Sequence, residues 1–198
     1  MPDNRPSTAN FISGAEPDYG PTTLQALIDK DAIRDLVFSY SRGVDRQDFN
    51  FLRTLYTADA IEDDHGGNFS GTGEAYVDWL EEVMGRVRAS QHQVYNHTIM
   101  LEGAYRAQGE VYLAGRTRLA LEEGGEEDLT HGLRYLDHYA KVGNKWLFAE
   151  RTIIVDWLEA APTQWAPERD DTRNAQFGTT GADDPSYRIL SHPYFRRR

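Results

Sequence analysis

The chain has 198 residues and a formal net charge of −11 at pH 7, and 39% of its residues are hydrophobic. This length suffices for one domain with a packed core. The negative charge disfavours nucleic acid, whose phosphates it would repel. There is no cysteine, which excludes disulfides, thiolate catalysis and cysteine-ligated metals. The sequence has neither a membrane-length apolar run nor a secretory signal, so we expect a cytoplasmic protein without membrane contacts.

The first regular element predicted is an amphipathic helix that Thr22 or Thr23 can cap and that runs to about Gly43. Tyr40 lies on its apolar stripe, and Asp45 follows just beyond the predicted helix end. The stripe comprises Leu24, Leu27, Ile28, Ile33, Leu36, Val37 and Tyr40.

Two further helices are expected, over about 49–55 and 74–88, with a brief strand at 60–63 between them. From Gln91 the apolar period changes to two. Four strands are predicted, over 92–102, 110–121, 130–142 and 145–157, and the turn sequences between them are short. Short connections imply antiparallel hairpins, so the fold class predicted is α+β, with helices packed on a curved antiparallel sheet.

Three regions are expected along the chain. Residues 1–20 form a flexible N-terminal arm, because proline, glycine and asparagine interrupt any period. Residues 21–160 form the folded domain. Residues 161–198 form an extended, polar C-terminal tail that wraps the body or a neighbouring subunit. Its expected apolar anchors are Trp165, Phe177, Tyr187, Ile189 and Leu190.

Four short sequences carry a resemblance to a known family. They are Tyr40…Gly43-Val44-Asp45, His92…Asn96, the segment 132–137, and the segment 146–151 followed by Asp156-Trp157. In this order, and with the element order above, the chain resembles the SnoaL-like branch of the NTF2-like superfamily, an α+β cone. The resemblance covers roughly residues 22–160.

The resemblance implies an activity and site residues. Its best matches are cofactor-independent lyases acting on bile acids, hexachlorocyclohexane, scytalone and diarylpropane compounds. It transfers a catalytic His–Asp pair to His92 and Asp45, a tyrosine to Tyr40 and an arginine to Arg151. An acidic residue of the bile acid enzyme falls near Gly115 here, which weakens the case for steroid dehydration. The relatives also imply a homotrimer and no cofactor.

Histidine can accept a proton near neutral pH, and a carboxylate against one ring nitrogen fixes its tautomer. We therefore predict that His92 is the base, that Asp45 orients it, and that Tyr40 donates a hydrogen bond to the leaving group or developing oxyanion. Without a family role, Asp45 would cap a turn and His92 would be a buried histidine with its hydrogen bonds satisfied. His97 is the rival base, but on a regular strand it faces away from the side that His92 faces.

Arg151 either binds a substrate oxygen or pairs with Asp45 or Glu150. The remaining candidate substrate-binding residues are Tyr95, Asn96, Tyr112, Trp79 and His97, although core packing explains the aromatic ones about as well. Asp63-Asp64-His65 invites comparison with a metal site, but adjacent residues seldom converge on one ion, so we predict no metal.

The function predicted is therefore a lyase that eliminates water, a halide or formaldehyde from a small, apolar, aromatic or cyclic substrate such as a lignin-derived diaryl compound. An isomerase or polyketide cyclase with the same residues is one alternative. A non-catalytic small subunit of a ring-hydroxylating dioxygenase, which shares this cone, is the other.

Overall fold

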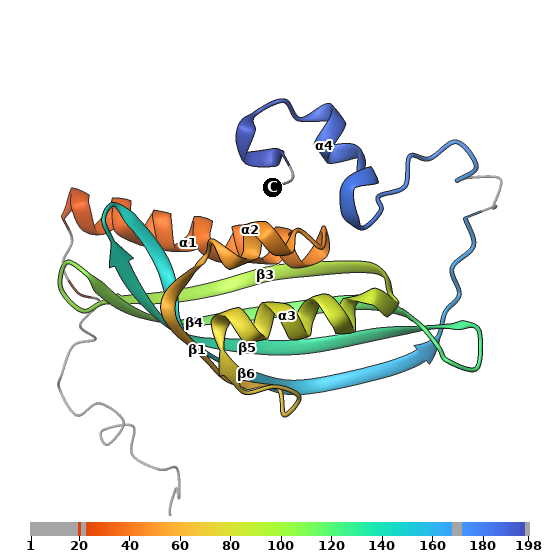
Figure 1. Cartoon of the computed structure of the whole chain (residues 1–198), viewed down its shortest axis with the longest axis horizontal. Coiled ribbons are helices and arrows are strands. Elements are labelled where there is room, and N and C mark those ends of the chain that lie inside the picture. The colour runs from red at the N-terminus through yellow and green to blue at the C-terminus, as the bar shows by residue number, and fades with distance from the viewer. Residues whose placement is uncertain (1–19, 21–22, 168–171, 197–198) are drawn as a thin grey trace, which may run out of the picture.

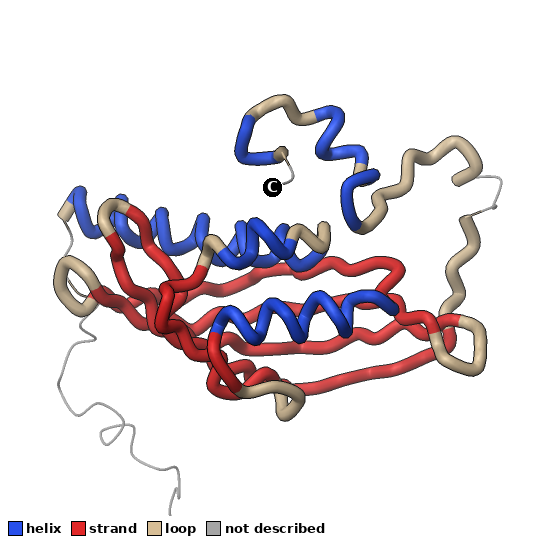
Figure 2. Tube along the Cα trace, in the orientation of Figure 1, coloured by secondary structure: helices blue, strands red, loops and turns tan. Residues whose placement is uncertain are grey.

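The computed structural model describes Gly20, residues 23–167 and residues 172–196. The arm predicted over residues 1–20 therefore lies, except for Gly20, outside the described residues. Helices cover one face of a six-stranded sheet (Figures 1 and 2), which confirms the α+β class. No helix in the described part of the chain is long and apolar enough to cross a membrane.

The sheet contains a four-stranded meander, as predicted, and two further strands. Its strands are β1 (Tyr56–His65), β2 (Gly71–Thr72), β3 (Val87–Leu101), β4 (Arg106–Ala120), β5 (Glu126–Val142) and β6 (Lys145–Pro162), in the order β2-β1-β6-β5-β4-β3. β3 to β6 pair antiparallel. β1, however, pairs with β6 in parallel, so the curved sheet is mixed, and its antiparallel strands β3 to β6 are the predicted meander. Because β1 and β6 are far apart in the sequence, no hairpin turn dictates their relative direction.

The helices on the sheet are α1 (Leu24–Asp45), α2 (Phe49–Arg53) and α3 (Gly73–Val83), and α3 continues into a 3-10 turn, η2 (Met84–Arg86). Thr23 caps α1, because its Oγ1 accepts a hydrogen bond from the amide of Ala26. α1 runs past the predicted end at Gly43, so Asp45 belongs to its last turn. A side chain at Gly43 would meet Leu52 at 2.6 Å. Glycine here thus lets α2 pack closely against α1.

The predicted apolar stripe of α1 divides into two parts. Ile33, Val37 and Tyr40 are buried in the core, whereas Leu24, Leu27 and Ile28 are 74%, 62% and 51% exposed. The five-residue step from Ile28 to Ile33 turns about 140° around a helix with 3.6 residues per turn. The first three residues therefore face away from the sheet, and their assignment to the inward stripe is wrong.

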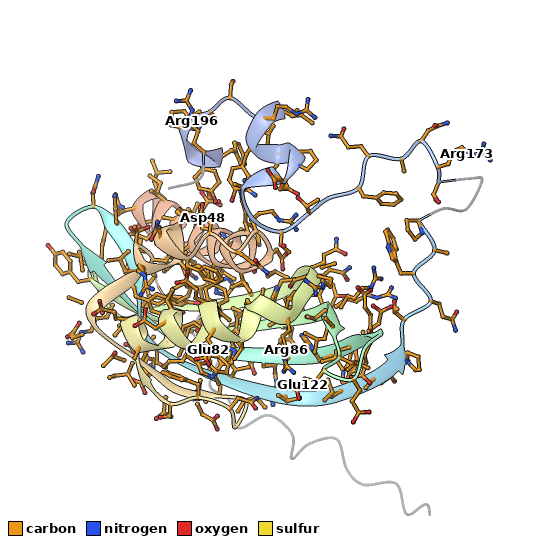
Figure 3. All side chains as sticks on the ribbon, turned by 45° about the vertical axis from the view of Figure 1, so that its right-hand side comes forward. Asp48, Glu82, Arg86, Glu122, Arg173 and Arg196 are labelled. Carbon is orange, nitrogen blue, oxygen red and sulfur yellow. The ribbon has the colours of Figure 1, made fainter. Side chains whose placement is uncertain are left out.

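The C-terminal segment packs on the side of α1 that faces away from the sheet (Figure 1). It contains η3 (Gly181–Asp183), α4 (Pro185–Ile189) and η4 (Pro193–Phe195), so it is less extended than predicted. Its contacts include an ion pair of 2.7 Å between Arg46 and Asp184 and a hydrogen bond of 2.7 Å between Ser39 and Tyr194. Asp48 also lies beneath this segment (Figure 3).

Among the predicted anchors of the tail, Tyr187 lies against the guanidinium of Arg42, and Trp165 packs edge-on against Phe177. Ile189 and Leu190 are exposed, and Trp165 and Phe177 are still 46% and 37% exposed. The segment thus contacts its own domain, largely through polar and aromatic groups.

Candidate active site

A cavity of about 540 Å³ lies between the helices and the inner face of the sheet. Most of its lining is aliphatic or aromatic. The lining residues with polar side-chain atoms are Tyr40, His65, Asn68, Tyr76, Trp79, Arg86, Ser90, His92, Thr117, His131 and Tyr135. Arg86 also forms an ion pair with Glu122 of the β4–β5 turn at 3.4 Å, and both are labelled in Figure 3. The cavity is therefore apolar with a few polar groups, as small-molecule sites usually are.

His92 and Asp45 meet at the wall of this cavity. The distance between His92 Nδ1 and Asp45 Oδ1 is 2.7 Å, and the backbone amide of His92 donates to Asp45 Oδ2 at 3.0 Å. The last turn of α1 supplies the carboxylate, and β3 supplies the histidine. With Nδ1 against the carboxylate, Nε2 is left as the ring nitrogen available to a bound molecule.

Asp45 is held as a carboxylate. Burial alone would raise its pKa, but hydrogen bonds from His92 and Ser90 outweigh that effect and hold the pKa below its usual value. Ser90 precedes His92 by two residues on β3, so both side chains point to the same face. An ionised Asp45 fixes the orientation of the imidazole and would stabilise its protonated form.

Tyr40 also lines the cavity, and its hydroxyl lies 2.6 Å from the hydroxyl of Tyr76 on α3. Burial raises the pKa of Tyr40 to about 12, so the phenol keeps its proton. Only one of the two hydroxyl hydrogens can lie between the two oxygens. The other remains available for donation elsewhere.

His131 of β5 lines the cavity as well, and the sequence analysis missed it. Its ring lies over Gly115 on β4, where a Cβ atom would be 2.0 Å from its Nε2. Burial and the nearby His92 lower the pKa of His131 to about 4, so it is neutral at neutral pH. Alternation on β5 could have revealed it, because His131, Leu133 and Tyr135 share one face.

His97 faces the same side of the sheet as His92, contrary to the prediction. Val94 pairs with Leu113 and His97 pairs with Val111, so three steps on β3 match two on β4. This β-bulge turns the odd separation of the two histidines into an even one. His97 nevertheless does not line the cavity. It is partly buried, and its Nε2 lies 3.1 Å from the hydroxyl of Tyr139.

Arg151 is fully buried and does not line the cavity. Its Nε and Nη2 donate to both oxygens of Asp137 at 2.7 and 2.9 Å. The predicted partners, Asp45 and Glu150, are therefore wrong, because Asp137 is the residue paired with Arg151 across β5 and β6. The guanidinium packs on three aromatic rings, those of Tyr40, Tyr135 and Phe148.

Of the other predicted binding residues, Trp79 lines the cavity. Tyr95 and Asn96 form the bulge of β3 and are exposed. Tyr112 is 43% exposed and faces Arg134, which pairs with Tyr112 across β4 and β5. These three side chains do not line the cavity.

The acidic residues beside His65 point in different directions. Asp63 accepts a hydrogen bond from Thr152, and Asp64 accepts one from the amide of Gly67. His65 Nδ1 instead lies 2.8 Å from Glu62 Oε1. Within the described residues, no group of three histidine, aspartate or glutamate side chains lies close enough to hold a metal ion.

A cone of helices on a curved mixed sheet is the architecture of the NTF2-like class of domain. The SnoaL-like domain family matches residues 25–152, and the chain belongs to this family. A search of curated proteins gave no significant match.

Solved structures with the same fold include two dehydratase- or dehydrochlorinase-type proteins. One is described as a candidate scytalone dehydratase from Novosphingobium aromaticivorans DSM 12444. It is 23% identical, with a TM-score of 0.61 over 72% of this chain and 97% of that one. The other is a type 2 hexachlorocyclohexane dehydrochlorinase, 19% identical, with a TM-score of 0.65 over 73% and 97%.

A third structure is a candidate aromatic ring hydroxylase from a Novosphingobium aromaticivorans strain. It is 21% identical, with a TM-score of 0.60 over 69% of this chain and 94% of that one. At these identities the likeness shows the shared fold.

Proposed function

We propose that this protein is a cofactor-independent lyase that eliminates a small group from a small, apolar, aromatic or cyclic substrate. The observation that carries the proposal is the contact of 2.7 Å between His92 and Asp45 at the wall of a largely apolar cavity. The dehydratase- and dehydrochlorinase-type neighbours in the same fold support it.

The cavity lining favours an aromatic substrate. On the α3 side, the rings of His65, Tyr76 and Trp79 pack against one another, with centroids 4.8 to 6.0 Å apart. Aliphatic residues of the sheet, among them Leu133 and Val155, line the same cavity. A planar ring could stack on the aromatic side and bury its edge against the aliphatic one.

The chemistry assigned to the site is an elimination. His92 Nε2 takes a proton from a carbon or hydroxyl of the substrate, and the electron pair released forms the new double bond. Water or halide departs with the electrons of its own bond to carbon. When the proton comes from a terminal hydroxyl, the O–H electrons form the C=O bond of formaldehyde, the C–C electrons form the C=C bond, and the adjacent hydroxyl leaves with the electrons of its C–O bond. Asp45 stabilises the imidazolium that forms, and Tyr40 donates a hydrogen bond to oxygen in the transition state. A base of this kind contributes about 10²–10⁴-fold to the rate.

The test compares wild type with His92→Gln on a panel of cyclic alcohols, alkyl halides and diarylpropanediols, with products followed by mass spectrometry. We expect the wild type to release water, halide or formaldehyde, and the variant to be about 10²–10⁴-fold slower. His97→Gln is the matched control, because His97 shares β3 but not the cavity, and it should keep the activity.

The outcomes discriminate between the alternatives. Equal turnover by wild type and His92→Gln would remove His92 from the mechanism. A product of unchanged mass would favour an isomerase or cyclase. Stable association with a larger iron-containing chain, without turnover of any probe, would favour the small-subunit role.

A further inference from the structure

A second histidine–carboxylate pair lies at the same cavity, on a different strand. His65 ends β1 and lines the cavity, and its Nδ1 lies 2.8 Å from Oε1 of Glu62. His92 is on β3, and three strands separate β1 from β3 in the sheet. The two histidines therefore approach the cavity from opposite ends of the curved sheet.

A β-bulge makes this second pair possible. Glu62 pairs with Arg151 and His65 pairs with Ile153, so three steps on β1 match two on β6. Without the extra residue, side chains three apart on a strand would face opposite sides. The bulge turns both toward the interior, where the carboxylate can hold the ring.

The position of the His65 ring is fixed on several sides. Its plane packs against Tyr76, with centroids 4.8 Å apart, and its edge meets Trp79 at 5.4 Å. Nδ1 is occupied by Glu62, and among the described residues no hydrogen bond to Nε2 is found. Nε2 is thus the nitrogen left for a molecule in the cavity, as it is in His92.

Burying the carboxylate of Glu62 costs free energy. Its side chain is fully buried, and its other contact is a long hydrogen bond of 3.5 Å from the hydroxyl of Tyr56. Burying a carboxylate is unfavourable unless it is paired and hydrogen-bonded. The most evident consequence of burying it is an oriented histidine at the cavity wall that can carry a positive charge.

We propose that His65 is the general acid of the site, so that the preferred leaving group is a hydroxyl. This proposal rests on the lyase function above. His92 removes a proton from carbon, and the C–H electrons form the C=C bond. The C–O bond breaks with its electrons moving to oxygen, and the proton on His65 Nε2 converts the departing group to water. His92 ends protonated and His65 neutral, and exchange with solvent restores both.

A halide needs no such proton, because it leaves as a stable anion. A pair of aromatic probes therefore isolates the role of His65: 4-hydroxy-4-phenylbutan-2-one and its 4-chloro analogue. Both give the same enone on elimination, and the uncatalysed rate is subtracted. Loss of the His65 ring from the cavity wall would slow both probes alike, whereas loss of its proton would slow only the alcohol. We therefore expect His65→Gln to lower the ratio of alcohol turnover to chloride turnover by about 10²-fold or more. His92→Gln should lose both activities.

His138→Gln is the matched control. His138 also pairs with a glutamate, Glu150, at 3.1 Å, but it is exposed and does not line the cavity, so neither activity should change. Glu62→Gln tests the residue that positions His65. It also provides a second, independent variant in case His65→Gln fails to fold. It should slow the alcohol more than the chloride, a selective effect that a general loss of structure would not produce.

Equal losses on both probes in His65→Gln, or no loss on either, would overturn the role of His65 while leaving the lyase function intact. No elimination from either probe by the wild type would count against the proposed function itself.

Discussion

The hydrogen atom that Gly115 carries in place of a side chain determines where His131 can lie. Gly115 stands on β4 directly between His92 on β3 and His131 on β5. Because no Cβ occupies that point, the ring of His131 can lie over the strand and share the cavity wall with His92. His92 and His131 can therefore both line the cavity because position 115 between them is a glycine.

We predict that Gly115→Ala displaces His131 and impairs the site more than the fold. The new methyl group would lie 2.0 Å from Nε2 of His131, so the ring must move, and overpacking of this kind costs about 1–3 kcal/mol. A small misplacement near the reacting groups can reduce kcat/KM by as much as about 10²-fold. The measurements are urea unfolding, kcat/KM and the ring resonances of His131.

Gly85→Ala is the control for this prediction, because a Cβ there meets nothing within 4 Å. It should leave the His131 resonances and the activity unchanged. Unshifted resonances in Gly115→Ala would show that the ring does not depend on the glycine.

At the scale of elements, β-bulges decide which side chains meet. The helices and the meander follow from local periodicity and turn residues, so the sequence pattern predicted them. The approach of Asp45 to His92 was predicted only from the resemblance to a known family. The orientations of His97 and of the Glu62–His65 pair depend on one extra residue in a strand. A prediction that assumes strict alternation of side chains cannot detect such a residue, because a bulge is defined by pairing with the partner strand. Arg151 was misassigned for a related reason, since its partner is set by the register of β5 and β6.

Removing one partner of the buried pair between β5 and β6 should be one of the more destabilising single changes, because it leaves the other charge buried and uncompensated. Asp137 neutralises Arg151 in a region enclosed by aromatic rings, and the hydroxyl of Tyr139 donates a further hydrogen bond to it at 2.8 Å. Asp137→Asn leaves the guanidinium without its counter-charge, which should cost about 3–5 kcal/mol of unfolding free energy in urea titrations. The double variant Asp137→Leu, Arg151→Met should recover much of this loss.

Asp156→Asn is the surface counterpart of that change. Asp156 pairs with Arg134 on the outer face of the same two strands, in contact with solvent, and solvent screens such pairs. Its effect should be much smaller than that of Asp137→Asn. Comparable losses from the two variants would contradict the importance assigned to burial.

At the scale of the whole molecule, the C-terminal segment packs on α1 but does not line the cavity. Residues 172–196 contact Ser39 and Arg42 of α1, Arg46 and Asp48 in the loop that follows it, and Phe51 of α2. None of the residues 172–196 lines the cavity. The segment therefore shields the outer face of the helix that delivers Tyr40 and Asp45, which helps to fix that helix on the sheet. Contacts with a neighbouring subunit and a trimeric assembly stay predictions.

Two partly buried histidines should make the stability of the whole fold depend on pH. Burial lowers the pKa of His97 and of His131 to about 4, whereas an unfolded histidine has a pKa of about 6.5. Above that value both are neutral in both states and contribute no pH dependence. Between about 6.5 and 4 the unfolded chain binds more protons, so the free energy of unfolding must fall as the pH falls. Asp45 acts in the same direction at lower pH, because its lowered pKa contributes stability that is lost as the pH falls below its ordinary pKa of 3.8.

We predict that His97→Gln flattens this dependence. Glutamine can still reach the hydroxyl of Tyr139 but does not titrate, so the slope of unfolding free energy against pH should decrease by about one proton between pH 6.5 and 4. The measurement is urea unfolding of wild type and variant at a series of pH values, and His131→Gln should act in the same way. Above pH 7 the difference between each variant and the wild type should be constant. A slope unchanged by His97→Gln would mean that His97 titrates alike in the folded and unfolded chain, which its burial beside Tyr139 argues against.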